Sequence, residues 1–167
     1  SSSVMKAEVI TPYFDENQED ISQSYQVKLE LFVIEGSYRN GYFNIILNIS
    51  KDYPFKGPTF YTTEPLWHPN IDLHTGQIFL PIEWSPVIRL YSIVFALQLL
   101  FLEPSDETIV NYEAGQLINT NSSQFDGTVQ SILHGGMING IQYPNYILKA
   151  QSCWCVTRNK LNNENQN

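Results

Sequence analysis

Two neighbouring segments with alternating side chains set the strongest constraint on the fold. Residues Tyr25–Val33 and Phe43–Ile49 carry apolar side chains at nearly every second position, the pattern of strands that lay one face on a core. Asn40-Gly41 lies between them, and both residue types tolerate positive φ, which favours a hairpin. Two such strands can bury their shared apolar face only against another layer. The sequence therefore predicts an antiparallel sheet that is covered on one side.

Two further strands extend this sheet. A turn at residues 52–58 precedes a short strand over Thr59–Thr63, and an earlier strand around Val9–Phe14 is expected to pair at the edge. Four prolines between residues 63 and 89 exclude a long regular element there, because proline lacks the N–H that helices and ladders use. The strand-forming part is thus a four-stranded antiparallel meander followed by an extended loop region.

Helical patterns follow this loop region. Residues Leu90–Glu103 lack proline and glycine and are apolar almost all round, which predicts a buried helix. Two more helices are expected over Glu107–Asn119 and Ser122–His134. Strands first and helices after indicate an α+β fold with the helices packed on one face of the sheet. We expect one domain over residues 1–158 and a disordered, Asn-rich tail over residues 159–167.

Composition excludes several function classes. The net charge of −8 and only 9 Lys and Arg residues argue against nucleic acid as a partner, because phosphate neutralisation needs clustered positive charge. No apolar run approaches the roughly 18 residues of a membrane span, so no membrane insertion is expected.

The two cysteines predict neither a disulfide nor a metal site. Cys153 and Cys155 are two residues apart, so a bridge between them would need a strained loop. A metal would need more ligands, and His68, His74 and His134 lie far away in the sequence. We expect free thiols in a reducing compartment, cytoplasmic or nuclear, and no metal or cofactor.

Five short motifs follow one another along the chain. They are Gly36-x-Tyr38-x-x-Gly41-x-Phe43, Tyr53-Pro54-Phe55-x-x-Pro58, His68-Pro69-Asn70-Ile71, Gly76-x-Ile78-x-Leu80 and Trp84-Ser85-Pro86. In this order and at this spacing they resemble the core of the ubiquitin-conjugating enzyme (UBC) family over residues 8–148. On residues 68–73, 99–104 and 135–146, the chain most resembles the family's conjugating enzyme of the Rub-type modifier (neddylation).

The resemblance implies that the catalytic residue is missing. Active members carry a cysteine between the isoleucine and the leucine of the fourth motif, and its thiolate accepts the modifier as a thioester. Here Phe79 stands at that position. The preceding loop is one residue longer at His74-Thr75 than in the family, and the segment between Leu80 and Trp84 is about three residues shorter. A displaced nucleophile remains an alternative.

The remnant motif His68, Pro69 and Asn70 has two interpretations. In active members the asparagine supports the oxyanion that forms when the thioester is attacked. Without a thioester, the favoured interpretation is that these residues fold the loop. Tyr53-Pro54 matches a family position with a cis peptide bond.

The resemblance also implies two protein-binding surfaces. Loops that contact RING-type ligases in active members correspond here to Phe55 and to Ser85, Pro86 and Val87. The alternative for Phe55 is inward packing that closes the turn. The second surface is the outer sheet face, which binds ubiquitin from behind in some members. Its residues are Gln26, Lys28, Glu30, Asn44 and Asn48.

Together these features predict an inactive conjugating-enzyme relative that works by binding proteins. The implied partners are ubiquitin or a ubiquitin-like modifier, a RING-type ligase, an active conjugating enzyme or a larger complex. The alternatives are a scaffold subunit that uses the fold only structurally and, third, an active conjugating enzyme.

Overall fold

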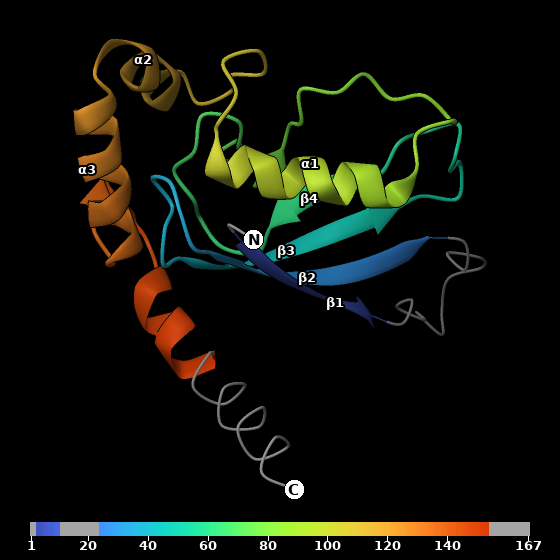
Figure 1. The fold of residues 1–167 in the computed structure, drawn as a ribbon, viewed down its shortest axis with the longest axis horizontal. Helices are drawn as coiled ribbons and strands as arrows, with labels where there is room; N and C mark the ends of the chain where they lie inside the picture. Colours follow the sequence, from blue (N-terminus) through green and yellow to red (C-terminus); the bar gives the residue numbers. More distant parts are fainter. Residues whose placement is uncertain (1–2, 11–23, 154–167) are drawn as a thin grey trace, which may run out of the picture.

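The computed structural model describes residues 3–10 and 24–153. These residues form an antiparallel sheet in the order β1-β2-β3-β4-β5, with helices on one face and at one end (Figure 1). The α+β prediction and its four-stranded meander are therefore confirmed, with a two-residue fifth strand added at the edge. The strands are β1 (Ser3–Ile10), β2 (Tyr25–Val33), β3 (Tyr42–Ile49), β4 (Thr59–Thr62) and β5 (Gln77–Ile78).

The strand register follows the alternation of the sequence. Leu29 pairs with Ile45 and Leu31 with Phe43, and all four side chains are buried. The predicted first strand was placed too late, because β1 ends at Ile10. The rest of that prediction, residues 11–14, lies outside the described residues. At the predicted hairpin, Asn40 has φ 66° whereas Gly41 does not enter the positive-φ region.

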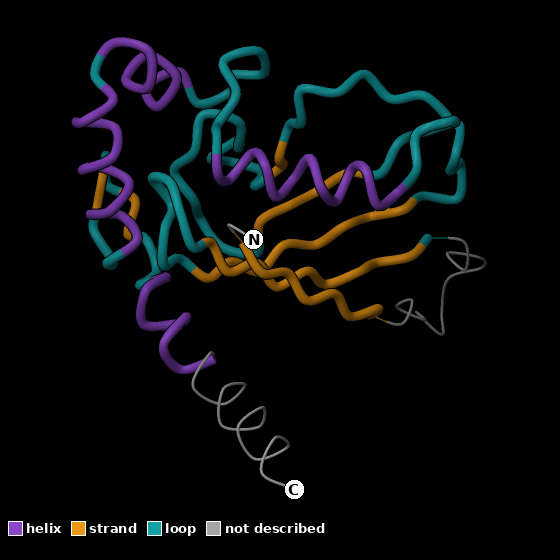
Figure 2. Tube along the Cα trace, viewed as in Figure 1, coloured by secondary structure: helices purple, strands orange, loops and turns teal. Residues whose placement is uncertain are grey.

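Helix α1 (Leu90–Leu102) lies across one face of the sheet (Figure 2). It buries Ile93, Leu97, Leu100 and Phe101 in the core. The prediction that this helix is buried is wrong for its other side, because Tyr91, Phe95 and Leu99 expose 70%, 58% and 46% of their surface. These three side chains form an outer stripe that the described residues leave exposed.

Helices α2 (Tyr112–Thr120) and α3 (Ser122–Leu133) pack at the end of the sheet. The prediction for α2 began five residues too early. Asn111 sets the actual start, since its side-chain oxygen accepts a hydrogen bond from Ala114 N at 3.3 Å, the usual role of an asparagine N-cap. Asn121 caps α3 in the same way through Gln124 N at 3.0 Å.

Two elements after α3 were not predicted. Strands β6 (Met137–Ile138) and β7 (Ile141–Gln142) form a small hairpin, and the chain is helical over residues 146–153. Asn139 and Gly140 both have positive φ, 51° and 78°, which is the signature of a type I′ turn. The sequence signal for the hairpin was thus present as Asn-Gly. Residues 154–158 of the expected domain and the predicted tail lie outside the described residues.

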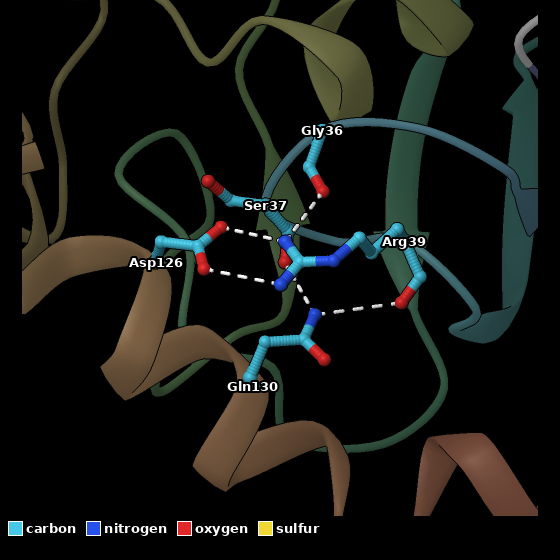
Figure 3. A network of polar contacts seen from close by, with 5 residues as sticks. All are labelled: Gly36, Ser37, Arg39, Asp126 and Gln130. Carbon is cyan, nitrogen blue, oxygen red and sulfur yellow. Dashed lines mark hydrogen bonds and ion pairs between the residues drawn. The ribbon is translucent and has the colours of Figure 1, made fainter. Parts of the chain in front are cut away.

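A polar network ties the β2–β3 connection to α3 (Figure 3). The Arg39 guanidinium donates to both Asp126 carboxylate oxygens, at 2.7 and 3.2 Å, and to Gly36 O. Gln130 Nε2 donates to Ser37 O at 2.8 Å. The ion pair holds the pKa of Asp126 below its usual range. Because both charged groups are partly exposed, we expect the network to fix the loop's position more than to stabilise the fold.

Two leucines of α1 give a matched test of its one-sided burial. Leu97 is fully buried and Leu99 is 46% exposed. We expect Leu97→Ala to lower the free energy of unfolding by about 2–5 kcal/mol, since it leaves a core cavity. Leu99→Ala should change it by less than about 1 kcal/mol. Chemical denaturation of both variants measures this, and equal losses would contradict the orientation of α1.

Candidate functional site

His68 lies at the centre of the remnant motif and is fully buried. Its ring stacks on Tyr38 at 4.8 Å and lies 5.4 Å from Phe101. Nδ1 accepts a hydrogen bond from Asn70 N at 3.0 Å, so Nε2 carries the proton and donates to Leu100 O at 3.1 Å. Burial lowers the pKa of His68 to about 3. The imidazole is therefore neutral at physiological pH, and both nitrogens are used within the fold.

The Asn70 side chain holds the loop that follows α1. Its Nδ2 donates to Ser105 O at 2.8 Å, Thr108 O at 3.0 Å and Thr108 Oγ1 at 3.1 Å. Its Oδ1 accepts from Ser105 N at 3.0 Å. The side chain is completely buried and its donors and acceptor all have partners. It is engaged as a structural clamp, with no amide hydrogen directed at a reacting group.

Phe79 lies directly beside this clamp. Its N–H donates to Asn70 O at 2.9 Å, and its carbonyl accepts from Thr108 Oγ1 at 3.0 Å. The structure thus brings the remnant motif and the Phe79 position together. The half-buried Phe79 helps to line a small pocket of about 170 Å³ with Leu80, Ile82 and Trp84. Its ring offers no nucleophilic atom there.

The lengthened loop before Phe79 closes into an exposed turn. Asp72 Oδ1 accepts from His74 N and Thr75 N, both at 2.8 Å, and these bonds lower the pKa of Asp72. Gly76 completes the turn at φ 74°, where an added Cβ would lie 2.9 Å from Thr62 O. Only glycine fits this close approach without strain.

The two predicted ligase-binding loops are tied together by Trp84. Its Nε1 donates to Pro54 O at 2.8 Å, and its ring lies 5.7 Å from that of Tyr53. The Tyr53-Pro54 bond is cis, as the resemblance implied. Phe55 is 83% exposed, which excludes the alternative of inward packing.

The second loop presents a similar surface. Val87 is 85% exposed, Pro86 is exposed, and Ser85 is half-buried with its carbonyl accepting from Ile88 N. Two exposed apolar side chains therefore project from two loops that share a tryptophan anchor. A role for these residues in protein binding stays a prediction.

The outer sheet face is only partly engaged within the chain. Glu30 accepts a hydrogen bond from Tyr42 Oη and lies 3.6 Å from Lys28 Nζ. The side-chain oxygens of Asn44 and Asn48 are buried, with no hydrogen-bond partner among the described residues. In register, Glu30 pairs with Asn44. The residues predicted for this surface do lie together, and ubiquitin binding there stays a prediction.

The structure describes one of the two cysteines. Cys153 is exposed on the helix over residues 146–153, and Cys155 lies outside the described residues. Within residues 3–10 and 24–153, no cluster of His, Cys, Asp and Glu is arranged to hold a metal ion. In the same ranges no helix has the length and apolarity to cross a bilayer.

The sequence did not predict a role for Ser105 or Thr108. Thr108 lies in the helix predicted from Glu107 and Ser105 just before it, and their contacts with Asn70 span 35 and 38 residues. No local pattern signals such a contact. The exposed stripe of α1 was missed for another reason, since an apolar helix looks the same whether one side or all sides are covered.

Acid should destabilise the protein through His68. The folded pKa of about 3 lies below the unfolded value of about 6.5, so the unfolded state binds a proton more readily. The stabilising effect of neutral His68 is complete above pH 6.5 and is lost as the pH falls toward 3. By pH 5 the loss is about 2 kcal/mol.

Denaturation at pH 5 to 7 and NMR titration of the imidazole measure this. His68→Gln should flatten the slope of unfolding free energy against pH. An imidazole that takes up its proton near pH 6.5 in the folded protein would contradict the assignment.

Known proteins with similar sequences belong to the family that the motifs resemble. The sequence model described as ubiquitin-conjugating enzyme matches residues 5–133. The chain is 37% identical over 125 residues to the Nedd8-conjugating enzyme UbcE2M of Drosophila melanogaster, covering 73% of this chain and 68% of that protein. It is 33% identical over 128 residues to the NEDD8-conjugating enzyme Ubc12 of Dictyostelium discoideum, covering 75% of this chain but only 55% of that protein.

A solved structure shares the fold. The structure titled S. cerevisiae Ubc12 superposes with a TM-score of 0.74 at 32% identity, covering 86% of this chain and 77% of that chain. The chain belongs to the ubiquitin-conjugating enzyme family and is related to NEDD8-conjugating enzymes.

Proposed function

We propose that this chain is a catalytically inactive member of the family that acts by binding proteins of a ubiquitin or ubiquitin-like modifier pathway. The observation that carries the proposal is Phe79, which stands where acyl transfer needs a thiolate. A benzyl side chain has no lone pair with which to attack a carbonyl. The family fold is retained, but residue 79 lacks the sulfur atom that would form the thioester.

The polar side chain that hydrogen-bonds Phe79 in the described residues does not replace the missing thiolate. The Thr108 hydroxyl already donates to Phe79 O and accepts from Asn70 Nδ2. His68 cannot act as a base for it, because both ring nitrogens are hydrogen-bonded within the buried core. A hydroxyl without a free base is a weak nucleophile at neutral pH.

The exposed loop residues support the binding part of the proposal. Phe55 and Val87 are among the most exposed large apolar side chains of the described residues, at 83% and 85%. Exposed aromatic and apolar side chains on rigid loops are favourable interface anchors. Trp84 and its bond to Pro54 supply that rigidity. We therefore assign Phe55, Ser85, Pro86 and Val87 to a docking surface for a RING-type ligase.

The relatives narrow the pathway. Since the similar proteins carry the name NEDD8-conjugating enzyme, a ligase or modifier of the NEDD8 class is the first partner to test, with ubiquitin second. We place this activity in a reducing compartment such as the cytoplasm or nucleus, because the only two cysteines of the sequence are two residues apart and would need a strained loop to form a disulfide with each other.

Removing the Phe55 ring should weaken ligase binding without affecting the fold. We expect Phe55→Ala to reduce affinity for a RING domain at least tenfold in a calorimetric titration, because a central aromatic anchor contributes about 2 kcal/mol or more. Tyr112→Ala is the matched control, since Tyr112 is 76% exposed on α2, outside the docking surface. If the chain without substitutions binds neither a RING domain nor a ubiquitin-like modifier, the alternative of a scaffold subunit is favoured.

Restoring the sulfur alone should not restore activity. We expect Phe79→Cys to be charged with a modifier at least 100-fold more slowly than an active conjugating enzyme, because misplacing a reacting group by about 1 Å costs about that factor. A non-reducing gel with activating enzyme, modifier and ATP measures this. Rapid charging of the variant would contradict the view that the loops around Phe79 have been remodelled.

A further inference from the structure

The outer face of α1 is an apolar stripe that nothing in the described residues covers. Tyr91, Phe95 and Leu99 follow one another at four-residue spacing, so they lie on one side of the helix. Their exposed fractions are 70%, 58% and 46%. The helix contains no charged residue over its 13 positions. An exposed helix face without any charge is unusual for a surface in contact with water.

The stripe borders a shallow groove. Its volume is about 660 Å³, and its walls are mainly apolar. Aromatic side chains carry about 150–250 Å² each, so the stripe exposes apolar area on the order of several hundred Å². The residues that line the groove are Leu90, Tyr91, Ser92, Val94, Phe95 and Gln98.

Both ends of α1 carry the charge that their own helix dipole disfavours. Arg89 is the N-cap residue and makes no side-chain capping bond, while the first turn contains no acidic residue. Glu103 is the C-cap residue, and the last turn contains no basic residue. Arg89 and Glu103 are exposed, as are Asp106 and Glu107 beyond the C-terminal end. A helix is stabilised by the opposite arrangement, with acids at its N-terminus and bases at its C-terminus.

We propose that α1 is the contact between two copies of this chain, packed antiparallel about a two-fold axis near Phe95. In this arrangement, Tyr91 of one copy lies opposite Leu99 of the other. Arg89 of each copy then lies within about one helical turn of the other copy's Glu103 and acidic end. Each helix terminus gains the charge that it lacks within its own chain, and the two dipoles oppose each other.

The charges at the two ends of α1 favour a second copy of this chain over other partners for the apolar stripe. A closed two-fold contact requires a surface that complements itself, and an uncharged centre with opposite charges at its two ends does so when the helices run antiparallel. The net charge of −8 on each chain opposes association, so we expect micromolar rather than nanomolar affinity. The proposal does not depend on the proposed function, since α1 contains none of the residues assigned to ligase docking.

Sedimentation velocity of the full chain from about 1 to 500 μM tests the contact. We expect a concentration-dependent dimer, and a dissociation constant that Phe95→Lys or Tyr91→Lys raises at least tenfold. Tyr112→Lys, on exposed α2, should leave it unchanged. Circular dichroism establishes that each variant is folded. A chain that stays monomeric up to 500 μM, or a dimer that both stripe variants leave intact, would overturn the proposal.

A charge exchange tests the antiparallel arrangement specifically. Arg89→Glu should weaken the dimer about tenfold, because it places two negative charges together at each end of the contact. Adding Glu103→Arg should restore most of the affinity. Failure of the second change to rescue the first would overturn the antiparallel arrangement, and a dimer of unchanged affinity in all variants would overturn the interface itself.

Discussion

The Asn70 side chain supplies the interaction on which the site depends. Its buried amide binds Ser105 and Thr108 in the loop after α1. The Thr108 hydroxyl in turn donates to the carbonyl of Phe79, the residue that follows β5. A buried amide left without partners would cost about 1–3 kcal/mol for each unmet hydrogen bond. The clamp therefore holds only if all of these segments are in place. Neutral His68 fixes the backbone at Asn70 by accepting a hydrogen bond from Asn70 N. Its ring packs against those of Tyr38 and Phe101.

This clamp would let the fold persist without a catalytic thiol, as the proposed function requires. The bonds that position Phe79 come from its backbone N–H and carbonyl, and they are indifferent to the side chain at that position. Replacing a thiol with a benzyl group removes the nucleophile and adds apolar surface beside Leu80 and Ile82. Stability and reactivity are thus separate at this site, and loss of one does not require loss of the other. The exposed loops around Trp84 remain available for binding.

Local sequence patterns predicted most of the fold. Contacts between residues far apart in the sequence could not be predicted from such patterns. Period-two alternation identified β2 and β3 almost to the residue, because each strand has one face on the core. The sequence also placed Phe79 beside the remnant motif, through the order and spacing of family motifs. It could not find Thr108, whose contact with Asn70 is set by tertiary packing. Nor could it tell which side of α1 is buried, since apolar residues occupy both sides.

The most direct test of the account is whether the chain ever carries a modifier. The full chain is incubated with activating enzyme, Mg-ATP and either a NEDD8-type modifier or ubiquitin, beside an active conjugating enzyme, and its intact mass is measured by mass spectrometry. With Phe79 at the acceptor position, the mass should stay that of the free chain while the active enzyme is charged. An adduct of one modifier, released by thiol reductant or by hydroxide, would contradict the account.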